Sequence, residues 1–218
     1  MTNWFLDFDD TLAKGGLTWA LEVSLPNFIR EHQLVYEETH LKKTMLDLQQ
    51  QASQNPNPMP LLHQLFVQVG WNTDLEMDLL NDINANYRPT LFEDTLPFLE
   101  RLKANGQAIY VLSNNPTAPY LLEAVNLTSY ITKVFTPKSF EGALRKPHRS
   151  MWDFILGAHD DITLENSVMV GNDPWTEGAF AQSCGLPIWL VDRTQRFTHL
   201  YDQPPFRWVG SLMEISVL

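Results

Sequence analysis

The chain has 218 residues, of which 44% are hydrophobic, and this is enough to bury the core of one domain together with a modest inserted module. Its formal net charge of -11 argues against binding to nucleic acid or to an anionic membrane, because both are polyanions. Cys184 is the only cysteine, which excludes an internal disulfide and a cysteine-rich zinc site and favours a reducing compartment.

The first predicted element is a short buried strand at residues 4–6. Residues 1–11 contain three aspartates and lack the basic segment and long apolar run of a signal peptide. No stretch of the chain reaches the ~18 to 20 apolar residues that a membrane span requires. We therefore expect a cytoplasmic protein that binds neither a membrane nor nucleic acid.

Two aspartates follow this strand at a spacing of two residues. Because the spacing is two, the side chains of Asp7 and Asp9 can leave the strand end on the same face. One carboxylate can attack phosphorus, while a second carboxyl protonates the leaving alkoxide and later takes a proton from water. Taken alone, the pattern fits a solvated turn after an edge strand equally well.

Residues 15–88 show helical patterns and no convincing strand. The patterns cover residues 17–34, 37–52, 60–69 and 74–87. The polar, proline-rich segment 49–60 is predicted to be a loop between two of these helices. Gly15-Gly16 and Arg88-Pro89 mark the two ends of the segment. We therefore predict a helical insertion at residues 15–88 and a core formed by residues 1–14 and 89–218.

Strands and helices alternate after the insertion. Residues 95–104 have leucines at a spacing of three, a possible cap in Asp94 and a left-handed stop at Asn105-Gly106. A further helix is predicted at residues 175–184. Apolar runs typical of buried parallel strands occur at residues 108–112, 134–135, 168–170 and 188–191. This alternation predicts a doubly wound parallel sheet.

Three polar segments of this half of the chain could join the two aspartates in one site. Ser113 ends the second strand and can donate a hydrogen bond to a phosphoryl oxygen. Lys146 lies in a basic run and could offset the charge of two carboxylates and a phosphate. Asp173 and Glu177 lie four residues apart and could hold Mg²⁺, which proteins bind through one or two carboxylates. Each segment also has an ordinary structural interpretation, as a strand-end cap, a solvated helix start or an acidic first turn.

Together the four segments resemble the four motifs of the haloacid dehalogenase-like hydrolase superfamily, over essentially the whole chain. FLDFDDTL is similar to the first motif, VLSN to the second, RKP to the third and VGNDPWTEGA to the fourth. The resemblance implies an α/β fold, with a Rossmann-like parallel sheet of strand order 3-2-1-4-5 and a helical cap inserted between the first two motifs. Asp10 stands where the family usually has glycine, and Glu177 aligns with the second of two aspartates in the fourth motif.

The resemblance also implies a magnesium-dependent phosphatase that acts on small phosphate monoesters through an aspartyl-phosphate. Asp7 is the expected nucleophile and Asp9 the expected acid and base, with Lys146 neutralising charge. The residues expected to bind phosphate are Asp10, Thr11, Ser113, Asn114 and Lys146. The expected ligands of Mg²⁺ are Asp7, Asp9 through its backbone carbonyl, Asp173 and Glu177.

Other activities on the same scaffold remain open. A haloacid dehalogenase would use Asp7 to displace halide from carbon and would need neither Asp9 nor Mg²⁺. A phosphomutase would share the entire site, and a non-catalytic binding module would keep only the fold. The presence of Asp9, Lys146 and Asp173 favours phosphorus chemistry. The expected partner is a small phosphorylated metabolite, and the oligomeric state is not determined by the sequence.

Overall fold

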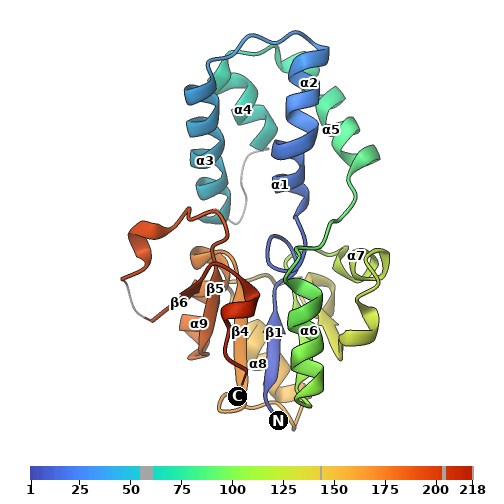
Figure 1. The fold of residues 1–218 in the computed structure, drawn as a ribbon, viewed down its shortest axis with the longest axis vertical. Helices are drawn as coiled ribbons and strands as arrows, with labels where there is room; N and C mark the ends of the chain where they lie inside the picture. Colours follow the sequence, from blue (N-terminus) through green and yellow to red (C-terminus); the bar gives the residue numbers. More distant parts are fainter. Residues whose placement is uncertain (55–60, 143, 203–204, 218) are drawn as a thin grey trace. The chain divides into compact units, whose positions relative to one another are not determined.

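The fold is that of a computed structural model, which describes residues 1–54, 61–142, 144–202 and 205–217. The chain divides into two compact units, one formed by Met1–Lys14 together with Pro89–Leu218 and the other by Gly15–Arg88. Figure 1 shows the strands in the first unit, while the described part of the second is helical. Within the described residues no helix is long and apolar enough to cross a membrane.

A six-stranded parallel sheet forms the centre of the first unit (Figure 1). Its order is β3-β2-β1-β4-β5-β6, which confirms the predicted order 3-2-1-4-5 and adds one strand at the edge. The additional strand was not predicted because Arg207, Trp208 and Val209 form too short and too polar a run to be recognised. The strands are β1 (Asn3–Leu6), β2 (Ala108–Leu112), β3 (Lys133–Phe135), β4 (Ser167–Gly171), β5 (Ile188–Val191) and β6 (Arg207–Val209).

Both faces of the sheet are covered, so every residue of the central strands β1, β2 and β4 is buried. Side chains leave a strand alternately on its two faces. Leu6 of β1 therefore packs in one cluster with α6 (Thr95–Ala104) and α7 (Ala118–Ala124). Its neighbour Phe5 packs in the other with α8 (Ser150–Ala158) and α9 (Ala179–Cys184).

The ends of α6 confirm one expectation from the sequence and correct another. Gly106 has φ 66°, the left-handed conformation that was predicted to stop this helix. Asp94 occupies the N-cap position, but its side chain makes no capping hydrogen bond, so the predicted cap is wrong. The Asp94 carboxylate accepts hydrogen bonds from Arg193, Ser211 and Leu212 instead.

The Gly15–Arg88 unit has a core of its own, in which Phe28, Phe66 and Leu79 are buried. The predicted loop at residues 49–60 is wrong for its first part, because the helix α3 (Glu38–Gln54) continues to Gln54. Glutamine and alanine, which make up most of residues 49–54, are good helix formers. Residues 55–60 lie outside the described residues. The helices of the unit are α1 (Gly16–Trp19), a π-helical turn at Ala20–Ser24, α2 (Leu25–Glu31), α3 (Glu38–Gln54), α4 (Leu61–Val69), a 3-10 turn at Thr73–Leu75 and α5 (Glu76–Asn86).

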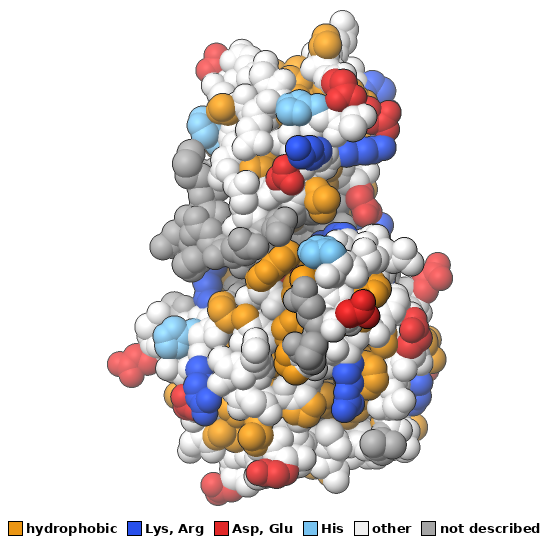
Figure 2. Space-filling view, turned by 90° about the vertical axis from the view of Figure 1, so that its left-hand side faces the viewer, with side chains coloured by type: hydrophobic (Ala, Val, Ile, Leu, Met, Phe, Trp, Pro, Cys, Tyr) orange, Lys and Arg blue, Asp and Glu red, His pale blue; other side chains and the backbone are white. Residues whose placement is uncertain are grey.

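The remaining helical segments of the first unit are short. They are the 3-10 turns Thr128–Tyr130, Pro137–Ser139, Thr198–Leu200 and Leu212–Glu214, and the π-helical turn Pro174–Gly178, which leads directly into α9. This turn and α9 together confirm the predicted helix at residues 175–184, and Gly185 ends it with φ 78°. On the face shown in Figure 2, acidic and basic side chains are interspersed, and no extended basic patch is visible among the described residues.

Candidate active site

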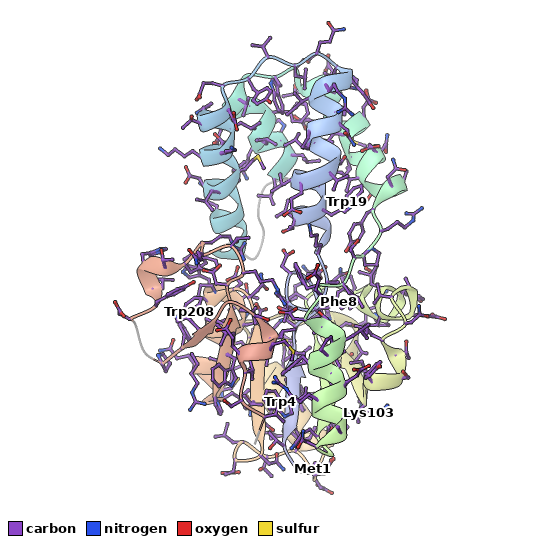
Figure 3. All side chains as sticks on the ribbon, in the orientation of Figure 1. Met1, Trp4, Phe8, Trp19, Lys103 and Trp208 are labelled. Carbon is purple, nitrogen blue, oxygen red and sulfur yellow. The ribbon has the colours of Figure 1, made fainter. Side chains whose placement is uncertain are left out.

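The predicted site residues follow the carboxyl ends of adjacent parallel strands. Asp7 comes directly after β1, Ser113 directly after β2, and Asp173 two residues after the end of β4. Figure 3 marks this edge by Phe8, at the opposite end of β1 from Met1. Open parallel sheets bind ligands at this edge. The topology therefore brings the first, second and fourth motifs to one place.

A buried lysine connects this edge to the third motif. Lys146 Nζ lies 2.7 Å from Asp7 Oδ1 and 2.6 Å from Glu177 Oε1. The side chains of Lys146, Asp7 and Glu177 are 0%, 8% and 4% exposed, so water screens these contacts little. The structure thus brings Lys146 to Asp7, as the sequence predicted, and adds a pairing with Glu177 that the sequence did not indicate.

Burial and neighbouring charges shift the pKa values of Lys146 and Glu177. Burial disfavours the ammonium of Lys146, but the carboxylates of Asp7 and Glu177 outweigh it and raise the pKa of Lys146 above its ordinary value. Burial, assisted by the charges of Asp7 and Asp173, raises the pKa of Glu177 to about 8 although Lys146 opposes this. Carboxyl groups outnumber ammonium groups in this cluster. An added positive charge would therefore stabilise the ionised carboxylates.

Asp9 has the protonation behaviour that an acid and base needs. Burial, and after it the negative charge of Asp7, raise the pKa of Asp9 to about 7. Asn115 Nδ2 donates to Asp9 Oδ2 at 3.1 Å, and this hydrogen bond lowers the pKa. At neutral pH both protonation states of Asp9 are thus populated. Sequence reasoning missed Asn115, whose only signal is its place just after the second motif.

The turn after Asp9 is tightly folded. Asp10 has φ 59°, a left-handed conformation that aspartate tolerates better than most residues and that explains why the resembling family usually has glycine there. Thr11 Oγ1 lies 3.3 Å from Asp7 Oδ2 and 3.3 Å from Asn172 Oδ1, so its single proton can serve one of them at a time. Thr11 thus supports Asp7, and Asn172 is a further site residue that the sequence did not single out.

The second motif supports the lysine of the third. Asn114 Nδ2 donates to the Lys146 carbonyl at 3.0 Å, and the Lys146 N–H donates to Asn114 Oδ1 at 2.7 Å. These two bonds fix the backbone of Lys146. Ser113 is buried, and its Oγ accepts from the Asn115 N–H at 3.0 Å, which leaves the hydroxyl proton for another acceptor. Phosphate binding by Ser113 and Asn114 stays a prediction.

In the fourth motif, Asp173 and Glu177 are engaged in different ways. Asp173 Oδ1 caps the following turn, accepting from the N–H groups of Trp175 and Thr176 at 2.8 and 3.0 Å. Glu177 uses one oxygen for Lys146 and the other for the Asp173 N–H at 3.2 Å. The structure therefore places Glu177 as a partner of Lys146, and metal binding by Glu177 stays a prediction.

The donor set fits Mg²⁺ without forming a complete protein cage. Within the described residues no group of three or more His, Cys, Asp or Glu side chains is arranged to hold a metal ion. Magnesium is usually bound by one or two carboxylates, with waters and substrate oxygens filling its other positions. Asp7 and Asp173 satisfy that requirement. A cation beside them would offset the negative charge that, after burial, raises the pKa of Asp9 and Glu177.

One glycine makes room for this arrangement, and its substitution tests it. A Cβ at Gly171 would overlap the Cβ and Cγ atoms of Glu177. Gly171→Ala should therefore displace Glu177, loosen Lys146 and cost about 1–3 kcal/mol of unfolding free energy. The matched control is Gly157→Ala in α8, where a Cβ meets nothing within 4 Å and alanine favours the helix. Denaturant unfolding of both variants is the measurement; equal stability of the two would contradict the close packing of Glu177 on Gly171.

Comparison with known proteins supports the resemblance from two directions. Residues 143–207 match the family model of HAD-hydrolase-like proteins, and this segment contains Lys146, Asp173 and Glu177. No curated protein sequence matches the chain. The family model supports the resemblance over the segment that carries the third and fourth motifs, and the solved structures support the fold.

Three solved structures illustrate the fold and its range of activities. A HAD-hydrolase of Bacillus subtilis, YfnB, bound to magnesium, has a TM-score of 0.71 at 14% identity, covering 98% of this chain and 96% of its own. A HAD phosphatase of Thermococcus onnurineus has a TM-score of 0.60 at 15% identity, with 98% and 95% covered. A 2-haloacid dehalogenase of Pseudomonas syringae has a TM-score of 0.56 at 17% identity, with 98% and 96% covered. At such identities the likeness shows the fold alone, so the choice of activity depends on the site.

Proposed function

We propose that this chain, which has the haloacid dehalogenase-like fold and matches the family model over residues 143–207, is a magnesium-dependent phosphatase of small phosphorylated metabolites. The observation that carries the proposal is the buried contact of Lys146 Nζ with Asp7 Oδ1 at 2.7 Å. The contact places a fixed positive charge beside the carboxylate that would attack the phosphate. Asp9, with a pKa of about 7, favours phosphorus over carbon chemistry because halide displacement needs no proton donor.

In the first step Asp7 attacks phosphorus, forming an oxygen–phosphorus bond while the bond to the leaving alkoxide breaks. Protonated Asp9 donates its proton to the alkoxide, which departs as an alcohol. In the second step Asp9 takes a proton from a water molecule as the water attacks the aspartyl-phosphate. This releases inorganic phosphate and regenerates Asp7. Each proton that Asp9 gives in the first step is thus returned in the second.

The other side chains bind and orient the phosphate. Lys146 and the Ser113 hydroxyl would donate to its oxygens, with Glu177 and Asn114 holding Lys146 in place. Asp7 and Asp173, with the Asp9 carbonyl, would hold Mg²⁺, which when bound neutralises charge on the transferring phosphoryl group. We further propose that residues 15–88 act as a cap that contributes substrate contacts. We also propose that the enzyme is cytoplasmic and binds neither a membrane nor nucleic acid.

The reaction class is tested by a panel of sugar phosphates, nucleotides, small acid phosphates and 2-haloacids, assayed with Mg²⁺ and with a chelator. Phosphate release that requires Mg²⁺ and returns when the metal is restored is the expected result. Halide release that survives chelation would make the protein a dehalogenase. Isomer formation without phosphate release would make it a mutase, and no turnover at all would favour a binding module.

The pH profile tests the role of Asp9. Because the first step requires protonated Asp9, kcat/KM should fall as the pH rises above about 7. Asn115→Ala removes a hydrogen bond that lowers the pKa of Asp9, so the alkaline limb should move to higher pH. Thr117→Val is the control: it removes only a hydroxyl bonded to Asn115 Oδ1 and should leave the limb unchanged. A shift of the Asn115→Ala limb to lower pH would contradict the assignment.

A further inference from the structure

A single arginine outside the four motifs is bonded to the turn that carries the predicted acid and base. Arg193 follows β5 by two residues, and its guanidinium is mostly buried, with 18% of the side chain exposed. Nη1 donates to the Asp10 carbonyl at 3.2 Å, and Nη2 donates to the Thr11 carbonyl at 3.0 Å. Two consecutive carbonyls of this turn are therefore held by one rigid group from another part of the chain.

Asp94 anchors this guanidinium through Nη2, the nitrogen that also donates to Thr11. Arg193 Nη2 lies 2.8 Å from Asp94 Oδ1, and Asp94 Oδ2 accepts from Ser211 Oγ and from the Leu212 N–H, each at 2.8 Å. Burial opposes the charge of Asp94, but the hydrogen bonds from Arg193, Leu212 and Ser211 outweigh it and lower its pKa below the ordinary value. The Arg193 guanidinium also lies 3.9 Å from the centre of the Phe92 ring. The contacts with Asp94 and Phe92 thus hold the Arg193 guanidinium in addition to its bonds with the turn.

The same turn is held at its next carbonyl. The Leu12 carbonyl accepts from Thr95 Oγ1 at 2.6 Å and from the Phe92 N–H at 3.2 Å. Three successive carbonyls after Asp9 are therefore bonded to residues 92–95 or to Arg193. The turn is also closed on itself, because the Leu12 and Ala13 N–H groups donate to the Phe8 carbonyl at 3.0 and 3.2 Å.

We propose that Arg193 is a positioning residue, which holds the turn after Asp7 so that the Asp9 carboxyl faces the phosphate. This inference rests on the proposed phosphatase function, and Arg193 itself does not touch the substrate. A displacement of about 1 Å in a reacting group can cost about 10²-fold in rate, so even a small relaxation of the turn would be measurable.

The chain supplies a matched control in Arg101. Its guanidinium also donates to backbone carbonyls, those of Met213, Leu212 and Ile215, and lies 5.6 Å from the centre of the Phe98 ring. Its bonds secure the carboxyl-terminal segment, whose Leu212 N–H also donates to Asp94, but none of them reaches Arg193 or the turn at residues 10–12. Arg101→Met and Arg193→Met therefore remove similar bonds, and only the second removes them from the site.

The experiment measures kcat, KM and Tm of both variants with the best substrate of the panel. Both variants are expected to lower Tm. Arg193→Met is expected to lower kcat by about 10- to 100-fold with KM changed less than about threefold, while Arg101→Met keeps kcat. If Arg193→Met does not fold, Asp94→Asn, which keeps the shape of the anchor but weakens its hold on Arg193, should lower kcat several-fold.

Two results would overturn the inference. One is an unchanged kcat in the folded Arg193→Met or Asp94→Asn protein. The other is an equal loss of kcat in Arg101→Met, which would reduce the role of Arg193 to general stability. Failure of the proposed function is distinguishable from both, because in that case the unmodified protein itself releases no phosphate from any ester.

Discussion

Asp7→Asn is expected to lower phosphate release by at least about 10⁴-fold, because an amide in place of the carboxylate cannot attack phosphorus. Asparagine has nearly the same shape, and Asp7 is only 5% exposed, so the substitution changes charge and nucleophilicity more than packing. The measurement is single-turnover phosphate release, together with mass spectrometry of the intact protein. The unmodified protein should form a phosphoenzyme, and the variant should not.

Asp192 provides the matched control for this substitution. It also directly follows a parallel strand, β5, and it is 1% exposed. Its carboxylate accepts from the N–H groups of Arg196 and Phe197, a structural role. Asp192→Asn should therefore lower stability and keep kcat. Near-full activity in Asp7→Asn would show that the nucleophile lies elsewhere.

Lys146→Met is expected to be damaging in two ways. It removes the ammonium that lies between the buried carboxylates of Asp7 and Glu177, and losing one partner of a buried ion pair costs about 3–5 kcal/mol. It also removes charge stabilisation of the phosphoryl oxygens, which should lower kcat by at least about 10²-fold. Denaturant unfolding and steady-state kinetics measure the two effects separately.

The stability loss of Lys146→Met should depend on pH. A carboxyl whose pKa is raised on folding destabilises the protein progressively as the pH rises from its ordinary pKa to the raised one. The pKa of Glu177 is already raised to about 8, and Lys146 is the partner that opposes this rise. The loss relative to the unmodified protein should therefore be smaller at about pH 5, where Glu177 is protonated in both proteins, than above about pH 8, where the unmodified protein ionises it more readily.

A double variant separates stability from catalysis. Lys146→Met with Glu177→Gln replaces the unpaired buried carboxylate by a neutral amide, so part of the lost stability should return while kcat stays low. Glu177→Gln alone is the control, since it leaves Lys146 paired with Asp7. A double variant no more stable than Lys146→Met would contradict the pairing of Lys146 with Glu177.

Local patterns in the sequence determined the architecture of the first unit. Short apolar runs that alternate with helical periodicity predicted five strands, and the family resemblance implied their order. The positions of Asp7 and Ser113 followed because residues after parallel strands share one edge. The left-handed stop at Gly106 was also predictable, because glycine adopts positive φ without steric cost. Such features depend on residues close together in the chain, so the sequence alone can show them.

Only the tertiary structure decided which of these residues pair. Metal binding by Glu177 stays a prediction, whereas its contact with Lys146, with its side chain packed closely on Gly171, is seen only in the structure. Asp94 was predicted as a helix cap, but the fold brings Arg193 from a distant part of the chain to the Asp94 carboxylate. These pairings form between groups that are far apart in the chain and approach one another only in the folded protein. A polar side chain's type limits what it can bind, and the fold selects among those partners.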